Sequence, residues 1–330
     1  MAKKILTISD IARLSGVAKS TVSRVINNSG FVSPETKARV SEVIAQYNYV
    51  PNAHAKSLSQ TQTNTIAVFI GDMSNQYFSE LFKGIESEII PSKYFPIICI
   101  CTNQERQELY LDEMLRRRVR GAIFASSDVY SRDKMDAFVE QIPCVSIQTY
   151  LDDVPIIGVD DFNGGYEMGK YLLSMGHRKF GYIHGRYFRS LEDRYQGFIR
   201  ALNEAGISED EVHVSYTDKE YRGRKAAEEL LQKDITCIQC CNDNVVLDVI
   251  KIIRGHGMNF PDDISVSGYD DLPNDTLFTP GITSVKQPLK DMGKLAAGTL
   301  LRMVDHNFVP EKEYTLKTQL AIRGSVKNIN

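Results

Sequence analysis

The sequence has no long apolar run. No stretch approaches the roughly 20 consecutive apolar residues that a membrane-spanning helix requires, and the first residues, MAKKILTISD, contain no apolar segment typical of a signal peptide. These absences argue against a membrane-embedded or secreted protein. We therefore expect a cytoplasmic chain without a membrane partner.

Catalytic and metal-binding motifs are also absent. No G-x-G-x-x-G or phosphate-binding P-loop opens a helix, and no G-x-S-x-G nucleophile elbow occurs. His54 and His177 have no partners arranged for catalysis. Cys237 and Cys240 form a C-x-x-C pair, but a zinc site needs a second pair, and the cysteines lie in strand-like apolar runs that favour a buried structural role. The sequence predicts no enzyme, no cofactor and no metal site.

Charge is distributed unevenly along the chain. Residues 1–63 contain eight Lys and Arg residues against three Asp and Glu residues, whereas the whole chain has 39 against 42. The remaining 267 residues are therefore net acidic. A basic head on an acidic body is typical of a protein that contacts phosphate with one end only.

The basic head has the pattern of three short helices. TISDIARLSG predicts a short helix in which Thr7 can cap and Asp10 stands at the capping-box position, and Gly16 then interrupts the helical pattern. AKSTVSRVIN follows directly with an apolar face, so the two segments predict a helix-turn-helix. A third helix is predicted from Ser33, with Pro34 at its first position. The three helices can bury one small core.

The run from Thr7 to Ser59 resembles the headpiece of the lactose-repressor (LacI/GalR) family, whose pattern is T-x-x-D-V-A-x-x-A-G-V-S-x-x-T-V-S-R-V-L-N followed by Y-x-P-N-x-x-A-R-x-L. The resemblance implies double-stranded operator DNA as partner, with the second helix in the major groove. It assigns the reading of base edges to Lys19, Ser20 and Arg24. It assigns phosphate contacts or docking to Thr21, Ser23, Asn27, Ser33, Thr36 and Tyr49.

One position departs from that pattern. The family usually has serine just before the second helix, whereas this chain has Ala18. Alanine does not cap a helix, so we expect a loss of about 1 kcal/mol of local helix stability and of one phosphate contact.

Residues 51–63 form the predicted hinge and linker. By the resemblance, Asn52, Ala55 and Leu58 belong to a hinge helix that becomes helical when two copies pair in the minor groove, where Leu58 wedges between base pairs. The segment is too short to be a stable helix alone in water. An ordinary frayed linker is the structural alternative.

From residue 64 onward, short apolar runs alternate with amphipathic helical patterns. Buried parallel strands are predicted at IAVFI, PIICIC, GAIFA and CVSIQ, and later at FGYIHG, TCIQC and ISVSGYD. The predicted fold class is therefore α plus α/β: a three-helix head at 1–50, then two doubly wound parallel-sheet lobes. The resemblance to the lactose-repressor family implies that these lobes are of periplasmic-binding-protein type. We place one lobe at about 64–160 plus 289–322 and the other at about 161–288 plus 323–330.

The body resembles the same family through DMSNQYFSEL, DDFNGGYEMGKYLLSMGHRKFGYI, EDRYQGFIRAL, CNDNVVLDVI, FPDDISVSGYDD and TSVKQPL. The residue types alone also allow structural roles, such as a helix-surface arginine or a core aromatic. Gln148 replaces an aspartate that many sugar-responsive relatives carry, which leaves the ligand class open. The resemblance assigns effector contacts to Asp72, Tyr77, Phe78, Gln148, Arg194, Asn242, Asp243, Asp270 and Gln287.

The resemblance as a whole implies a nucleoid-associated transcription regulator. We expect a repressor of a carbohydrate-utilisation operon that a small sugar releases from a palindromic operator. The alternatives are a purine-type regulator and a catabolite-control type with a phosphocarrier protein as corepressor. The carboxyl end, YTLKTQLAIRGSVKNIN, lacks a leucine heptad, which predicts a homodimer without a tetramerising helix.

Overall fold

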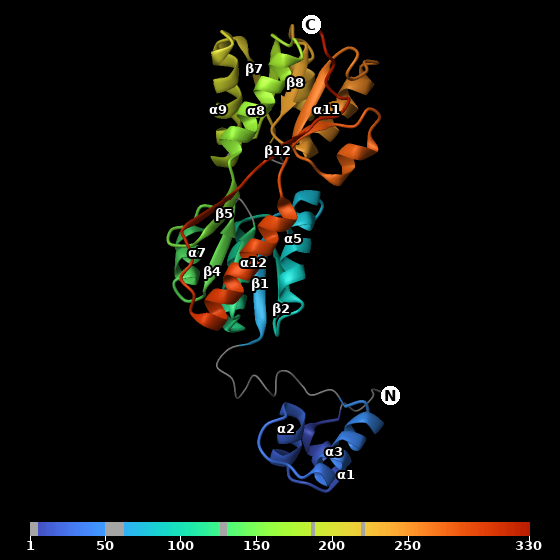
Figure 1. The fold of residues 1–330 in the computed structure, drawn as a ribbon, viewed down its shortest axis with the longest axis vertical. Coiled ribbons are helices and arrows are strands. Elements are labelled where there is room, and N and C mark those ends of the chain that lie inside the picture. Colours follow the sequence, from blue (N-terminus) through green and yellow to red (C-terminus); the bar gives the residue numbers. More distant parts are fainter. Residues whose placement is uncertain (1–5, 50–62, 126–130, 186–188, 219–221) are drawn as a thin grey trace. The chain divides into compact units, whose positions relative to one another are not determined.

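The chain divides into a head, Met1–Thr63, and a body, Asn64–Asn330 (Figure 1). The computed structural model describes residues 6–49, 63–125, 131–185, 189–218 and 222–330.

The head contains α1 (Ile8–Ser15), α2 (Lys19–Asn27) and α3 (Pro34–Gln46). The predicted capping box is present: the amide of Asp10 donates to Thr7 Oγ1 at 3.3 Å, and the amide of Thr7 donates to Asp10 Oδ2 at 2.9 Å. Gly16 adopts the left-handed φ of 65° that ends α1 and allows the tight turn into α2.

The head is held together by one small apolar core. Ile11, Val22 and Val40 come from the different helices and are each fully buried. Partly buried apolar side chains such as Val25 and Ile44 pack around them. The helical apolar stripes of the sequence therefore meet as predicted.

The first lobe of the body is built on a parallel sheet in the order β11-β5-β4-β3-β1-β2. In its register, Val68 lies opposite Ile98 on one side and Ile123 on the other. The order 2-1-3-4-5 places a topological switch point between β1 and β3. The strands are β1 (Thr65–Ile70), β2 (Phe95–Ile100), β3 (Gly121–Ala125), β4 (Cys144–Ile147), β5 (Ile156–Val159) and β11 (Glu313–Leu316).

Helices cover both faces of this sheet. Because side chains alternate along a strand, Ile66 and Val68 join the core beneath α5 and α12, whereas Ala67 and Phe69 join the core beneath α6 and α7. Figure 1 shows α12 lying across the lower lobe beside α5. These helices are α5 (Gln76–Ile89), α6 (Gln104–Arg116), α7 (Arg132–Val139) and α12 (Leu289–His306).

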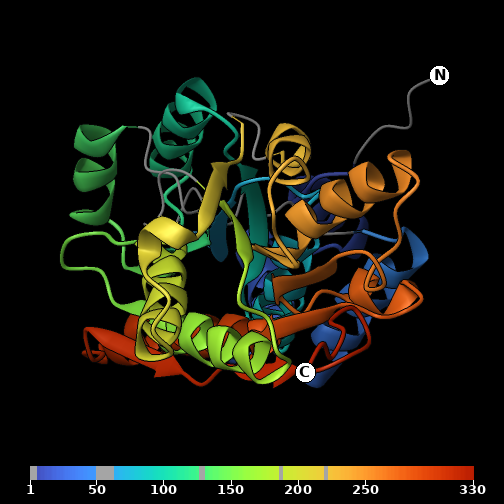
Figure 2. The ribbon, with the colours of Figure 1, turned by 90° about the horizontal axis from the view of Figure 1, so that it is seen from above.

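The second lobe repeats the strand order as β12-β10-β9-β8-β6-β7, with β12 antiparallel to β10. Its helices flank the central strands on both sides, as the view in Figure 2 shows. The strands are β6 (Phe180–His184), β7 (His213–Tyr216), β8 (Cys237–Cys240), β9 (Ser265–Asp270), β10 (Thr283–Lys286) and β12 (Gln319–Ala321). The helices are α8 (Asp161–Ser174), α9 (Arg189–Glu204), α10 (Arg224–Leu230) and α11 (Asp243–Gly255), with short turns of 3-10 helix at Glu209–Glu211 and Pro273–Leu277.

Two glycines bring α8 and α9 into backbone contact. A Cβ atom at Gly165 would lie 1.9 Å from the carbonyl oxygen of Arg194, and one at Gly197 would lie 1.9 Å from that of Phe162. Only glycine permits such an approach. The contact fixes Arg194 of α9 beside the amino-terminal end of α8.

The fold class of the prediction is confirmed, with differences in detail. The short strands β5, β7, β10, β11 and β12 and the long helix α12 were not among the predicted elements. The last crossing between lobes falls between Leu316 and Gln319, because β12 pairs with β10, whereas the prediction assigned all of 289–322 to the first lobe. Among the residues described, no helix is long and apolar enough to span a membrane.

Candidate functional site

The second helix of the head, α2, exposes polar side chains on the side away from the core. Val22 points inward and is fully buried, while Lys19, Ser20 and Arg24 are exposed. The predicted base-reading residues are thus available on one short helix. Ala18 holds the extended N-cap backbone, and its side chain forms no capping hydrogen bond, as the sequence predicted.

Four of the residues predicted to hold phosphate also support the head internally. The amide nitrogen of Asn27 donates to Ser23 Oγ at 3.2 Å. Ser33 caps α3: its hydroxyl accepts from the amide of Thr36 at 3.3 Å and donates to Thr36 Oγ1 at 2.9 Å. All four lie at helix ends or on the exposed side of α2, where a phosphate oxygen could compete for the same donors.

Tyr49, which the resemblance assigns to phosphate contact or docking, lies in the core of the head. Its side chain is 9% exposed and belongs to the apolar core of the head, and burial raises the pKa of its hydroxyl. Thr21 is half-buried on α2. The predicted hinge contacts Asn52, Ala55 and Leu58 lie outside the described residues.

In the body, Arg194 is the centre of a buried polar cluster. Its Nε donates to Asp161 Oδ1 at 2.8 Å, and its Nη1 donates to the carbonyl oxygen of Cys241 at 2.9 Å and lies 3.5 Å from Asp270 Oδ1. The guanidinium also lies over the ring of Tyr269, 3.8 Å from its centroid. A planar guanidinium held on several sides is a fixed donor for paired hydrogen bonds.

A chain of hydrogen bonds links this cluster to the first lobe through Gln148. Its Nε2 donates to Asp161 Oδ2 at 3.1 Å and to Gln287 Oε1 at 3.2 Å. Its Oε1 accepts from the hydroxyl of Tyr77. Gln287 Nε2 in turn donates to Asp270 Oδ1 at 2.7 Å, so the chain closes back on the arginine. Five side chains from distant parts of the sequence form one ring, at the carboxyl ends of both sheets.

Burial sets the electrostatics of this ring. Burial raises the pKa of Asp161, although the charge and hydrogen bond of Arg194 oppose the shift. Burial raises the pKa of Asp270 to about 8, again against the effect of Arg194. Burial by itself lowers the pKa of Arg194, but the two carboxylates outweigh it and raise that pKa. The site therefore holds a permanent cation and one or two carboxylates shielded from water.

Two members of the ring have unusual backbone conformations. Gln148 has φ of 51° and Asp270 has φ of 116°, a region that residues with a Cβ atom rarely adopt. Such conformations persist where the surroundings over-determine them and are concentrated at functional sites.

Two predicted residues at the start of α11 make contacts that support the second lobe. Asn242 caps the helix by accepting from the amide of Val245 at 3.0 Å. Asp243 is buried and accepts from the amide of Leu272 at 3.0 Å and from Ser284 Oγ at 2.8 Å. Asp243 thereby holds the chain that leaves β9 just after Asp270.

The remaining predicted residues lie in the first lobe after β1. Asp72 is exposed and accepts from the amide and the hydroxyl of Ser74, at 2.8 and 2.6 Å; these hydrogen bonds lower its pKa. Phe78 packs on Gly71, where a Cβ atom would lie 2.9 Å from the phenyl ring. The structure therefore does not bring Asp72 or Phe78 into the ring.

Comparison with known proteins agrees with both units. The family model described as bacterial regulatory proteins, lacI family, matches residues 7–52, and a periplasmic binding protein-like domain matches 170–326. The regulator DegA of Bacillus subtilis is 34% identical over 334 residues, covering 98% of this chain and 99% of that protein. The repressor PurR of Pasteurella multocida is 31% identical at the same coverage.

The chain belongs to the lacI family of bacterial regulatory proteins. Two solved structures of transcription regulators are similar to it. A lacI-family regulator from Enterococcus faecium with bound ribose superposes with a TM-score of 0.76 at 27% identity, covering 81% of this chain and all of that one. The CelR–cellobiose complex gives 0.72 at 26% identity, with 97% and 99% covered. This lacI-family chain is therefore a DNA-binding transcription regulator.

The sequence alone did not identify two residues of the cluster in this lacI-family regulator. Asp161 is 7% exposed, and it follows β5, a strand of four residues that the apolar pattern did not predict. Tyr269 is 1% exposed and precedes Asp270 at the end of β9. Their position after or at the carboxyl end of a parallel strand was the available signal, because ligands of such sheets bind at that end.

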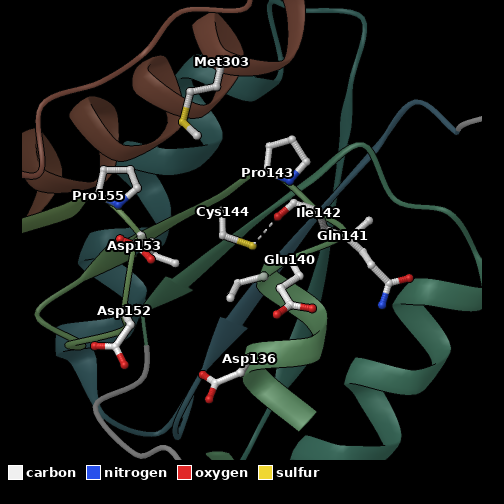
Figure 3. A pocket seen from close by; sticks show the side chains of 12 residues that line it. Asp136, Glu140, Gln141, Ile142, Pro143, Cys144, Asp152, Asp153, Pro155 and Met303 are labelled. Atoms are coloured by element: carbon white, nitrogen blue, oxygen red, sulfur yellow. Dashed lines mark hydrogen bonds between the residues drawn. The ribbon is translucent and has the colours of Figure 1, made fainter. Parts of the chain in front are cut away.

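A separate hollow of about 600 Å³ lies at the opposite end of the first sheet. Figure 3 shows it between the end of α7, the starts of β4 and β5, and Met303 of α12. Asp136, Glu140, Asp152 and Asp153 give its lining an acidic character. Cys144 Sγ donates to the carbonyl oxygen of Ile142 at 3.0 Å, and burial raises the pKa of this thiol above its usual value. The hollow lies at the amino-terminal strand ends, away from the ring around Arg194.

Proposed function

We propose that this regulator is a repressor whose hold on operator DNA is controlled by a small polyhydroxylated effector. The observation that carries the proposal is the ring of Arg194, Asp161, Gln148, Gln287 and Asp270, in which Gln148 is half-buried and the other four side chains are buried. Carboxylates, amides and a guanidinium together offer both donors and acceptors. Vicinal hydroxyl groups of a sugar match such paired positions.

The head supports the DNA side of the proposal. Lys19, Ser20 and Arg24 are exposed on α2, and Arg24 can bond the O6 and N7 atoms of one guanine together. Asn27, Ser33 and neighbouring hydroxyls position the helix through phosphates. Two heads in a symmetric homodimer would read the two halves of a palindromic operator.

The effector acts through the angle between the two lobes. Effector bound at the ring around Arg194 changes that angle in each protomer, which alters the separation across the dimer of the two predicted hinges at residues 51–63. The sign of the effect depends only on which state the effector binds more tightly.

Binding to DNA tests the first half of the proposal. The purified full chain is titrated by fluorescence anisotropy onto duplexes from the region upstream of its own operon and onto a shuffled duplex of equal length and composition, at a fixed salt concentration of about 0.15 M. We expect at least about a thousandfold preference for one upstream site, the lower end of the range for specific DNA-binding proteins. Equal affinity for all duplexes would overturn the assignment.

An effector screen tests the second half. Ribose, cellobiose, other mono- and disaccharides, sugar phosphates and purines are tested for thermal stabilisation of the full chain. Hits are then added to the operator titration. A sugar that stabilises the chain and changes operator affinity supports the proposal. Stabilisation by purines alone would assign the purine-type function, and a response that needs a phosphorylated carrier protein would assign the catabolite-control type.

A further inference from the structure

Gln148 lies between two of the chain segments that connect the lobes. The first connection runs from β5 to α8 and carries Asp161; the second runs from β10 to α12 and carries Gln287. The amide nitrogen of Gln148 donates to both, at 3.1 and 3.2 Å. One side chain of the first lobe therefore joins both connections. We call these two connections the hinge segments between the lobes; they are distinct from the predicted hinge at residues 51–63.

All polar atoms of the Gln148 amide group are used in this arrangement. Its two N–H groups serve the two hinge segments, and its oxygen accepts from Tyr77 on α5. Burial raises the pKa of the Tyr77 hydroxyl, so this group remains a neutral donor. The direction of every hydrogen bond around Gln148 is thus fixed by its partners.

The lobes also touch away from the hinge. Gln76 Nε2 of α5 donates to Asn274 Oδ1 at 3.1 Å, and the guanidinium of Arg189 lies 4.5 Å from the ring centroid of Tyr150. The ring around Gln148 is therefore enclosed by contacts between the lobes, and its hydrogen bonds are satisfied by the protein alone.

We propose that Gln148 is a hinge latch that an effector must displace. This inference rests on the proposed effector function of the same ring. The amide of Gln148 occupies the donor and acceptor positions that two adjacent hydroxyl groups would take between Asp161 and Gln287. An effector that takes these partners releases Gln148 from both hinge segments, and in this way its binding changes the angle between the lobes.

The latch can be tested without knowing the effector. Hydrogen–deuterium exchange is measured on the full chain, free of small molecules, for wild type, Gln148→Ala and Gln148→Met, the last preserving side-chain volume without an amide. Gln196→Ala is the matched control, because Gln196 is exposed on α9 and, among the described residues, donates only to Glu192 on the same helix.

We expect amides in 156–161 and 286–290 to exchange about tenfold faster in both Gln148 variants than in wild type, and unchanged in the control. If Gln148→Ala unfolds the chain, the test rests on Gln148→Met alone, because methionine fills the same volume and leaves no cavity. Hinge exchange equal to wild type in a folded Gln148→Met variant would overturn the latch.

A second measurement connects the latch to DNA binding. Operator affinity of Gln148→Met without sugar is expected to shift at least threefold towards the value that wild type shows with its stabilising sugar. A shift in the opposite direction, or none, would contradict the latch while leaving the effector function intact. Conversely, a wild-type chain that ignores every sugar would refute the proposed effector, whereas the exchange result on the hinge would stand.

Discussion

Arg194 and Asp161 form an ion pair that is almost fully buried, with 2.8 Å between Nε and Oδ1 and side-chain exposures of 5% and 7%. Two glycines, Gly165 and Gly197, permit the close helix contact that places the pair. Asp161 is the first residue of α8, just after β5, and Arg194 lies in α9. The pair therefore holds α9 against the point where the chain enters the second lobe. Its strength therefore bears on both stability and effector binding.

Replacing Arg194 by alanine should destabilise the chain strongly. The change leaves Asp161 and Asp270 buried without their cation, and we expect a loss of about 3 to 5 kcal/mol in the free energy of unfolding. Urea unfolding followed by circular dichroism measures it. Arg200→Ala is the control, because Arg200 is 63% exposed in its 2.8 Å pair with Glu204 and should cost under about 1 kcal/mol. Equal losses in both variants would show that the buried ion pair contributes no more to the free energy of unfolding than the exposed pair does.

The Asp270→Asn variant should lose a pH dependence of stability. Burial, partly offset by Arg194, raises the pKa of Asp270 to about 8, whereas an unfolded aspartate titrates near 3.9. Between these values the folded chain binds more protons than the unfolded chain, so the free energy of unfolding falls as the pH rises from about 4 to 8. We expect the variant to be more stable than wild type at pH 8, by about 3 to 5 kcal/mol.

Asp305→Asn provides a control of opposite sign. Burial favours a higher pKa for Asp305, but hydrogen bonds from Lys93 and Tyr94 outweigh it and lower the pKa. The carboxylate therefore stabilises the folded chain above the unfolded pKa, and this stabilisation is lost as the pH falls. Asp305→Asn should be less stable than wild type at pH 7. Parallel pH profiles for the two variants would refute this assignment of signs.

Ala18→Ser should stabilise the second helix of the head. The N-cap backbone of α2 already has the extended conformation of a capped helix, with φ of −67° and ψ of 151°, but lacks a side-chain acceptor. A serine oxygen can accept from the uncapped amides of the first turn, which we expect to add about 1 kcal/mol. Hydrogen exchange of the α2 amides measures the gain. Ser33→Ala, which removes the existing cap of α3, should give a loss of similar size there.

Arg24→Ala should remove sequence discrimination without unfolding the head. Arg24 is exposed, so thermal stability should stay within about 0.5 kcal/mol of wild type. Operator affinity should fall by about 1 to 3 kcal/mol, and substitution of the contacted guanine should then cost nothing further. Arg13→Ala on α1, 75% exposed, serves as the charge-matched control. An unchanged penalty for the guanine substitution in Arg24→Ala would exclude this contact.

The sequence predicted most of the head and the class of the body. Capping and periodicity are local, so Thr7, Gly16 and the uncapped Ala18 could be placed before the structure was known. The strand β5 escaped prediction because its run IIGV is too short to show a period, whereas β4 and β8 were predicted from the apolar runs CVSIQ and TCIQC that contain them. β12 escaped because only its pairing with β10 makes it a strand.

The candidate site was predicted in part. Arg194, Asp270, Gln148 and Gln287 meet in one ring, and Tyr77 donates to Gln148, although their side chains come from separate elements. The sequence could not distinguish Asn242 and Asp243 from the members of the ring, because a helix cap and a ligand contact use the same residue types. Asp161 was missed because its burial depends on a crossing between lobes that no local pattern marks.

Operator affinity with and without sugar, in wild type and Asp270→Asn, tests the central claim most directly. We predict that the sugar found in the screen changes wild-type operator affinity at least tenfold, and that Asp270→Asn binds the operator like sugar-free wild type and responds to the sugar at least tenfold less. A wild-type affinity that the sugar does not move, or an identical response in Asp270→Asn, would contradict control of DNA binding from this cluster.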